Sequence, residues 1–417
     1  MVSALSAVFW FIVTFSILVI IHEGGHFATA RAFGVHVHEF MIGLPGPAVR
    51  VHGKQTDYGI TAIPLGGYVR IAGMEPGPED ELLGSALAFV TTARRATVHQ
   101  LAEALDVDMT RADALLATLA DWNAVTAVDE DTFEAKFPAE SAEDPVALLD
   151  LARSTTYAGL PTWKRIVVLS AGVVMNILAA ILVFVVLLSA YGVWSPTLTI
   201  DSIVKGSGAA AAGLAHGDTI TAIDGRALKD WDALLATISA HKPGQTVTVT
   251  YTHDGTTKTA AIKLMNSGGQ PKVGIMVEQA RVRQPLGTAF SDSFSYIGQV
   301  MKVIAGFFRP STFKSSLSQS SSVIGVSIVV SEEVKQGPAN YAFIVAALSL
   351  SLGLVNILPI PPLDGGKVAI EIVQRIWGRP LSRNFSIGLS AAGTVLLFAF
   401  IGYLMYADVV RYVVKGG

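Results

Sequence analysis

Two histidines and a glutamate stand together near the start of the sequence, in the order His22-Glu23-Gly24-Gly25-His26. On a helix, residues four apart share one face, so both imidazoles can reach one zinc ion. Glu23 then lies beside an open coordination position, where its carboxylate can take a proton from a zinc-activated water. This spacing predicts peptide-bond hydrolysis. The competing interpretation, polar residues that merely end an apolar helix, is disfavoured because intramembrane ionisable groups are costly unless they function.

A third ligand is expected in the segment 356–366, which reads Asn-Ile-Leu-Pro-Ile-Pro-Pro-Leu-Asp-Gly-Gly. Asp364 ends a long uncharged run and is bracketed by prolines and glycines, which favours a broken helix end that lines a cavity. A simple turn is the alternative, because Asp-Gly is a common turn dipeptide. The sequence contains no cysteine. A zinc site must therefore use His and carboxylates, and disulfides and thiolate catalysis are excluded.

The composition indicates a membrane protein with soluble parts. Of the 417 residues, 51% are hydrophobic and only 15% are charged, against about 25% charged in ordinary soluble domains. The first long uncharged run leads directly into the charged pair His22–Glu23, without a small-residue cleavage site, so we expect it to be retained as a membrane span. Four uncharged runs approach or exceed the ~20 residues that cross a bilayer: Ala4–Ile21, Ile166–Trp194, Gly337–Leu363 and Phe385–Ala407.

The basic residues that flank these runs predict the orientation, since cytoplasmic flanks are enriched in Lys and Arg. One set of flanks holds Arg31, Arg153, Lys164, Arg165, Lys367, Arg375, Arg379 and Arg383, and the opposite set holds only Lys205, Lys335, Arg411 and Lys415. The count places both termini and residues 195–336 outside the cytoplasm. It places residues 75–160, and the end of the first span with His22, on the cytoplasmic side.

Two segments outside the four uncharged runs have β-rich patterns. In 35–74, β-branched and aromatic residues alternate with polar ones up to a break at Gly66-Gly67, which predicts strands whose edges could bind an extended peptide; an ordinary surface hairpin is the alternative. In 195–280, strands such as Thr246–Thr252 alternate with turns such as Asp254-Gly255, which predicts a small folded domain.

Beyond this domain, apolar residues recur every three or four positions from Phe290 to Phe308. We expect an amphipathic helix on the outer membrane surface or against the small domain, then a polar linker at Ser315–Ser322.

Residues 75–160 form an acidic insert. Positions 75–150 contain 17 acidic and four basic residues, a net charge of −13. Segments Val98–Leu105, Thr110–Asp121 and Val125–Phe137 suggest a helix-turn-helix with a wing, a fold that often binds DNA. Binding a polyanion needs a basic face, which this charge excludes. We therefore predict no nucleic-acid partner, and a regulatory or protein-interaction module with a protein partner.

Taken together, these motifs resemble the site-2 protease family of intramembrane zinc metalloproteases, in its bacterial PDZ-containing group. Four segments carry the resemblance: the zinc-binding helix at 22–26, the Asn-x-x-Pro…Leu-Asp-Gly segment at 356–365, a membrane-reentrant β element at Phe40–Gly43 and Ile63–Val69, and a PDZ signature at Gly206–Leu214 and Gly217–Gly225. A fifth segment, from Thr162 to Asn176, resembles the family's second core helix. It has Val173 where the family has proline, so we assign no role to Asn176.

The resemblance implies roles for individual residues. His22, His26 and Asp364 would bind Zn²⁺, and Glu23 would be the general base. Asn356 would contact substrate or the developing oxyanion. The β element, at Gly66, Gly67 and Tyr68, would hold substrate in extended form.

The resemblance also implies a function. The protein would be a zinc-dependent endopeptidase in the bacterial inner membrane, cutting single-pass substrates such as pre-trimmed anti-sigma factors and remnant signal peptides in regulated intramembrane proteolysis. The PDZ domain would act as a size filter, or would capture a peptide or chain end. The alternative is a catalytically silent PDZ-containing membrane scaffold, which has no need of a buried Glu23.

The expected fold is mainly α: a polytopic membrane protein with four transmembrane helices, a membrane-reentrant β element, one extracytoplasmic PDZ domain and a cytosolic winged-helix-like insert. The expected segments are 1–34 (first span with the zinc motif), 35–74 (β element), 75–160 (insert), 161–194 (second span), 195–280 (PDZ domain), 281–336 (amphipathic helix and linker), 337–366 (third span with the third ligand) and 367–417 (cytosolic connection and fourth span).

Overall fold

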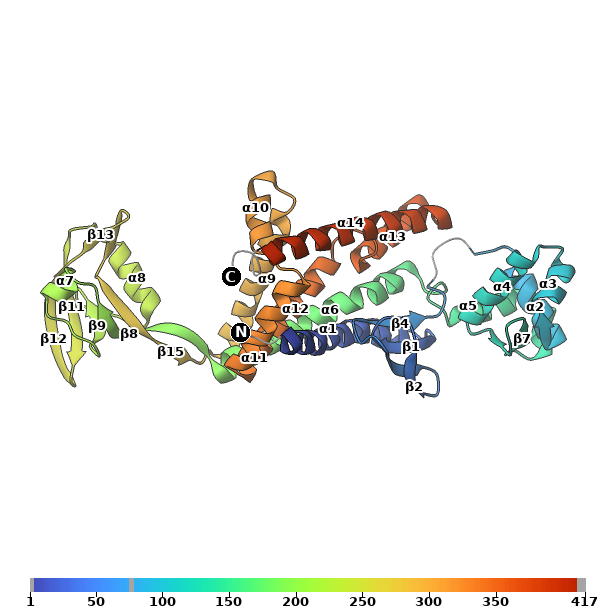
Figure 1. Cartoon of the computed structure of the whole chain (residues 1–417), viewed down its shortest axis with the longest axis horizontal. Helices are drawn as coiled ribbons and strands as arrows, with labels where there is room; N and C mark the ends of the chain where they lie inside the picture. The colour runs from blue at the N-terminus through green and yellow to red at the C-terminus, as the bar shows by residue number, and fades with distance from the viewer. Residues whose placement is uncertain (1–3, 75–78, 411–417) are drawn as a thin grey trace. The chain divides into compact units, whose positions relative to one another are not determined.

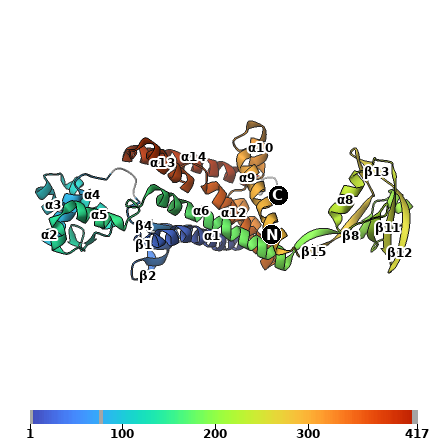
Figure 2. The same ribbon diagram turned by 180° about the vertical axis from the view of Figure 1, so that it is seen from behind.

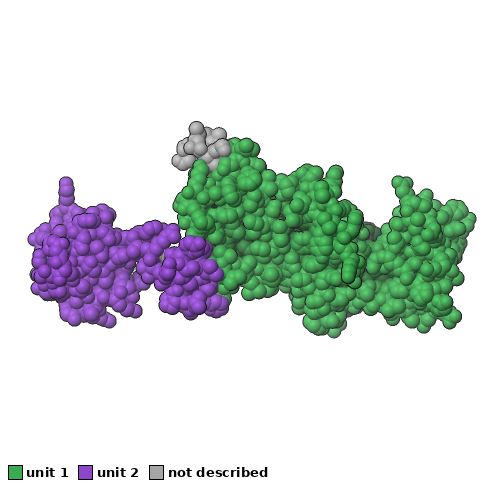
Figure 3. All heavy atoms as spheres, turned by 90° about the horizontal axis from the view of Figure 1, so that it is seen from below, with its two compact units in different colours: residues 1–184, 291–417 green, residues 185–290 purple. Residues whose placement is uncertain are grey.

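The computed structural model describes residues 4–74 and 79–410. These residues form two compact units, one of residues 1–184 with 291–417 and the other of residues 185–290 (Figure 3). The first unit contains most of the apolar helical bundle, together with a small β-sheet and the acidic insert. The second is a β-rich domain.

Four helices of the described chain are long and apolar enough to cross a membrane. Figures 1 and 2 show where each of them runs. A helix suits these runs because its backbone groups pair within the segment, where lipid offers no partners. The first helix continues beyond the predicted end of the apolar run at Ile21, so the His22–His26 motif is helical. The four helices are α1 (Ala4–Ala32), α6 (Thr162–Val186, continued by a π-helical turn to Tyr191), α12 (Pro338–Asn356) and α14 (Arg383–Val409).

The bundle is held together inside by close apolar packing and a few polar contacts. Phe184 of α6 is buried against Ala346 and Leu350 of α12. The Thr14 hydroxyl of α1 is hydrogen-bonded to the Tyr341 hydroxyl of α12 at 3.0 Å. Between membrane helices such contacts replace the hydrophobic effect, because lipid tails are as apolar as the side chains themselves.

A four-stranded sheet follows α1 in the chain and packs against it. Its strands are β1 (Val37–Ile42), β2 (Ala48–His52), β3 (Asp57–Thr61) and β4 (Gly67–Ile71), in the order β2-β3-β1-β4. Strand β1 pairs with β3 in parallel and with β4 in antiparallel orientation. Strand β4 therefore lies at one edge of the sheet and, like β1, contacts α1.

The acidic insert has its own apolar core. Leu87, Leu101, Leu116 and Leu119 are fully buried within it, and burying one such side chain contributes about 1.5–3 kcal/mol. The two helices expected here are present, at Val98–Leu105 and Met109–Asp121, while the likeness to a winged helix stays a prediction. The elements of the insert are α2 (Leu83–Ala93), β5 (Arg95–Thr97), α3 (Val98–Leu105), α4 (Met109–Asp121), β6 (Val125–Ala127), β7 (Thr132–Ala135), a 3₁₀ turn (Ala139–Glu143) and α5 (Pro145–Ser154).

The second unit is built around a sheet in the order β12-β11-β9-β8-β15, with β10 beside β9. The expected turn at Asp254-Gly255 joins β11 to β12, and both residues have positive φ (47° and 75°), as a two-residue type I′ turn requires. Its core includes Ile200, Ile220 and Val249. The elements are β8 (Val193–Ile203), α7 (Gly208–Ala211), β9 (Thr219–Ile223), β10 (Arg226–Ala227), α8 (Trp231–Ser239), β11 (Thr246–His253), β12 (Thr256–Lys263), β13 (Met265–Ser267), β14 (Gln270–Lys272) and β15 (Ile275–Val282).

The segment after this domain corrects one expectation. The amphipathic run is helical, in α9 (Leu286–Gly306). The polar linker predicted at Ser315–Ser322 is wrong over its first half, because α10 (Pro310–Ser318) is a helix that begins at a proline. Proline is well suited to the first helical position, and the Ser318 hydroxyl bonds back to the carbonyl of Ser315 within the helix. Helix α11 (Val323–Gln336) follows and contacts α1.

Candidate metal centre

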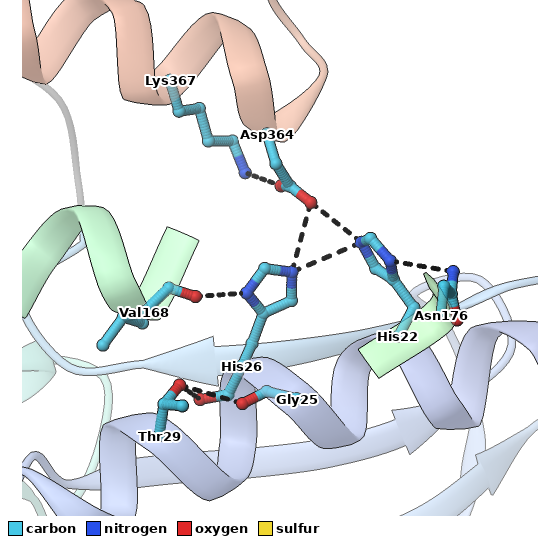
Figure 4. Close-up of polar contacts among 8 residues, drawn as sticks. All are labelled: His22, Gly25, His26, Thr29, Val168, Asn176, Asp364 and Lys367. Atoms are coloured by element: carbon cyan, nitrogen blue, oxygen red, sulfur yellow. Dashed lines mark hydrogen bonds and ion pairs between the residues drawn. The ribbon is translucent and has the colours of Figure 1, made fainter. Parts of the chain in front are cut away.

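Helix α1 carries His22 and His26 on one buried face, one turn apart (Figure 4). Their Nε2 atoms are 3.3 Å apart. Both nitrogens also approach the same carboxylate oxygen, Oδ2 of Asp364, at 2.9 Å from His22 and 3.3 Å from His26. Two imidazole nitrogens and one carboxylate oxygen thus converge on one point from distant parts of the chain.

Asp364 reaches this point because the third span is broken. Helix α12 ends at Asn356, the following segment is irregular, and α13 (Asp364–Trp377) begins at Asp364 itself. The next two residues must be glycine, since a Cβ on Gly365 would lie 2.1 Å from the carbonyl oxygen of Ile357, and one on Gly366 would lie 2.3 Å from the nitrogen of Pro361. The two glycines of the Asp-Gly-Gly sequence therefore allow the irregular segment to pack closely against the first turn of α13.

Helix α13 also makes polar contacts through Glu371, near the middle of the helix. Glu371, two turns after Asp364, accepts a hydrogen bond from the Tyr157 hydroxyl at 3.1 Å and forms an ion pair with Arg165 at 3.5 Å. Burial, reinforced by the Glu371 carboxylate, raises the pKa of Tyr157, so this phenol stays protonated and donates. The prediction for residues 367–417, a cytosolic connection and the fourth span, did not include this helix.

The spacing of the three converging atoms fits a zinc ion. Ligands at ~2.0–2.1 Å in a tetrahedron lie about 3.3 Å from one another. Two of the observed separations, at 3.3 Å, equal that edge length, and the third, at 2.9 Å, is slightly shorter. His22, His26 and Asp364 are all buried, and among the described residues they are the cluster that could hold a metal ion.

Helix α6 forms the wall behind the histidines. The carbonyl oxygen of Val168 accepts a hydrogen bond from Nδ1 of His26 at 2.7 Å, and the Asn176 amide contacts Nδ1 of His22 at 3.2 Å. Gly172 lies between them. No role was predicted for Asn176, because Val173 replaces the family's proline. The signal in the sequence is its spacing of four from Gly172 and eight from Val168, which places all three on one helix face.

Glu23 and Asn356 are close in sequence to the three ligands, but their side chains form no hydrogen bond with them. Glu23 is half-buried on α1, and its carboxylate interacts electrostatically with His22, His26 and Asp364. Asn356 is the half-buried last residue of α12. Across residues 4–74 and 79–410, neither side chain has a hydrogen-bond partner within the protein. Both remain able to bond to water or substrate.

The predicted β-element residues lie at the start of the edge strand β4: Gly66 immediately precedes it, and Gly67 and Tyr68 are its first two residues. Gly66 has φ +88°, and a Cβ on Gly67 would lie 2.8 Å from the side chain of Val19 on α1. Val19 is three residues before His22, about 5 Å along the helix axis. The Tyr68 hydroxyl donates to Glu39 at 2.9 Å, so this side chain is occupied within the sheet, and it is the backbone of β4 that lies near the histidine turn.

The chain matches known proteins over nearly its whole length. Residues 10–400 match peptidase family M50. The chain belongs to this family. Its relatives include zinc metalloprotease RasP of Shouchella clausii, 28% identical over 96% of this chain and 97% of the relative, and the protein LL2128 of Lactococcus lactis, 27% identical over 96% and 97%. A solved PDZ domain of an SdrC-like protein from Listeria monocytogenes is 33% identical and covers 20% of this chain and 90% of that one, with a TM-score of 0.19. The protein is therefore a zinc metalloprotease of the M50 (site-2 protease) family.

Gly172 offers a steric test of the centre of this M50 peptidase. A Cβ there would lie 2.5 Å from Nε2 of His26 and 2.8 Å from Nε2 of His22, the two atoms that face the carboxylate. We expect Gly172→Ala to displace the imidazoles and to lower both zinc content and peptidase activity at least tenfold. The measurements are metal analysis and cleavage rate of the purified protein. Gly298→Ala is a matched control on α9, because a Cβ there has nothing within 4 Å; equal zinc content in both variants would contradict the close packing.

Proposed function

We propose that the protein is an intramembrane endopeptidase that uses zinc held by His22, His26 and Asp364 to hydrolyse peptide bonds in single-pass membrane proteins. The observation that carries this proposal is the buried convergence of the three ligand atoms at 2.9–3.3 Å. Two of them are on α1, a helix long and apolar enough to span a membrane. Membership of the M50 family supports the same chemistry.

Each residue of the centre has a distinct task in this proposal. Bound zinc supplies a Lewis acid for the scissile carbonyl and lowers the pKa of a water molecule. Glu23, one residue after His22, accepts a proton from the attacking water at a carboxylate oxygen and returns it to the leaving amine nitrogen. Asn356 donates its amide hydrogens to the substrate backbone or to the developing oxyanion.

Substrate is held as an added strand. A transmembrane helix must unwind before one of its bonds can be cut, and its freed backbone groups then need partners in a medium without water. The edge strand β4 offers such partners next to the histidine turn of α1. This suits single-pass substrates, with pre-trimmed anti-sigma factors and remnant signal peptides as the candidates in regulated intramembrane proteolysis.

Residues 195–280 are proposed to act as an extracytoplasmic PDZ domain, on the strength of their sequence signature. The domain either excludes untrimmed substrates by size or captures a peptide or chain end by strand addition. The charge count of the flanks supports a multi-pass protein of the bacterial inner membrane, with the metal centre toward the cytoplasmic side.

The acidic insert is proposed to be a cytosolic module that binds a protein partner. Its sequence suggests a helix-turn-helix with a wing, but the net charge of −13 over residues 75–150 repels a polyanion. We expect no binding of duplex DNA by the full-length protein at physiological salt, measured by fluorescence anisotropy. Saturable binding that weakens with added salt would contradict this assignment.

The deciding experiment is cleavage of a tagged single-pass helical substrate in proteoliposomes, by the protein as purified and after treatment with a zinc chelator. We expect cleavage that the chelator removes and added zinc restores. The competing function is a PDZ-containing scaffold without catalysis. A protein that contains no zinc and cleaves nothing would favour the scaffold.

A further inference from the structure

Asn176 has an unusual position for a polar residue in a membrane helix. Its side chain is fully buried. As placed, its amide nitrogen is 3.2 Å from Nδ1 of His22, while its Oδ1 atom is buried without a hydrogen-bond partner. A buried acceptor without a partner costs free energy, so native structures rarely retain one without a reason.

The state of the histidine supplies the reason. With its amide nitrogen toward His22, Asn176 donates, so Nδ1 carries no hydrogen and the ring proton is on Nε2, where it can donate to Asp364 at 2.9 Å. A neutral imidazole that binds metal through Nε2 instead carries its proton on Nδ1, and that proton needs an acceptor. Rotating the side-chain amide of Asn176 by 180° exchanges the positions of its nitrogen and its oxygen. Oδ1, which has no partner as placed, then faces Nδ1 of His22 and can accept its proton.

His26 already has an acceptor for its Nδ1 proton. Its Nδ1 donates to the carbonyl oxygen of Val168 at 2.7 Å, so in the neutral ring the lone pair is on Nε2. Val168, Gly172 and Asn176 follow one another at intervals of four on α6, so one face of one helix meets both rings. Gly172 has no side chain where a Cβ would strike both Nε2 atoms.

We propose that Asn176 is a positioning residue for the zinc centre, whose Oδ1 accepts the Nδ1 proton of His22 and so directs the Nε2 lone pair to the metal. The inference rests on the proposed function, since it needs a metal at His22. Outer partners of this kind fix the ring orientation and raise the basicity of the ligand, and their loss typically lowers metal affinity 10–100-fold.

Two substitutions separate this role from simple packing. Asn176→Asp keeps the shape and can accept but not donate, whereas Asn176→Leu fills a similar volume and can do neither. Thr14→Val is the matched control, because it removes a buried hydrogen bond from α1 two turns before His22 and touches none of the ligands. All variants are made in the Glu23→Gln background, so the readouts do not depend on turnover.

The measurements are the zinc dissociation constant, by chelator competition, and the visible spectrum of the Co²⁺-loaded protein, which reports ligand geometry. We expect Asn176→Leu to bind zinc 10–100-fold more weakly with an altered Co²⁺ spectrum, and Asn176→Asp and Thr14→Val to stay within about threefold of the parent. Equal affinity and spectrum in the Leu variant would overturn the inference.

Weak zinc binding by the Asn176→Asp variant would also overturn the inference, because it would mean that His22 needs a hydrogen-bond donor at this position and not an acceptor. The Asp result decides the question even if the Leu variant does not fold. If the parent protein, Glu23→Gln, binds no zinc, the proposed function itself is refuted. If the parent binds zinc and the Asn176 variants bind it equally well, only the role of Asn176 is refuted.

Discussion

Glu23→Gln should remove cleavage of a single-pass substrate while leaving zinc bound. The amide keeps the size and shape of the carboxylate but cannot take a proton from the attacking water, and a general base contributes on the order of 10²–10⁴-fold to a rate. No other described side chain hydrogen-bonds to Glu23, so the substitution breaks no internal contact. The measurement is the initial cleavage rate in proteoliposomes, with metal analysis of the same preparation.

The control for this variant is Glu333→Gln on α11, a carboxylate-to-amide change at a residue that accepts a hydrogen bond from Asn340 and lies outside the metal centre. It should cleave at the rate of the unaltered protein. If Glu23→Gln kept a tenth or more of the activity, the role of Glu23 as general base would be wrong, since even the low end of the range above is larger.

Asp364→Asn should release the metal. An amide oxygen carries no charge and is a poorer zinc ligand than a carboxylate, so we expect a loss of zinc affinity at least as large as the roughly 10–100-fold loss caused by removing an outer partner. Activity should fall with zinc content. His22→Ala should give the same result, because it removes a different member of the same triangle.

A matched control is Asp408→Asn on α14. Asp408 is also buried and accepts hydrogen bonds from the backbone nitrogens of Ser322 and Gly325, so its loss tests what a buried carboxylate contributes to the fold alone. We expect this variant to unfold at a lower temperature yet to bind zinc fully when folded. Full zinc occupancy in Asp364→Asn would show that Asp364 is not a ligand.

Local features of this protein were predictable because they depend on residues near one another in the chain. The interval of four in His22–His26 places both imidazoles on one helix face wherever that helix packs. The turn at Asp254-Gly255 follows from the φ values that these residues tolerate. The four spans follow from uncharged runs of sufficient length, since lipid leaves a helix as the way to pair the backbone.

Other features required the packed structure. The sequence offered Asp364 as a third ligand with a turn as the alternative, and the structure brings it within 2.9 Å of a histidine 342 positions earlier in the chain. The helix of α13 was missed because its first turn depends on glycines fitted against the irregular segment before it. Asn176 was set aside on a local difference in sequence, although its contact with His22 is made across two helices.

The sequence by itself therefore determined the kind of chemistry, the membrane spans and the acidic character of the insert. The tertiary structure decided which residues meet. In lipid, helices associate through the fit of small residues and a few hydrogen bonds rather than through a hydrophobic stripe, and a contact such as Gly25 against the backbone of Ala171 and Gly172 leaves no periodic signal. Helix α6 thus became the wall of the metal centre through its packing against α1.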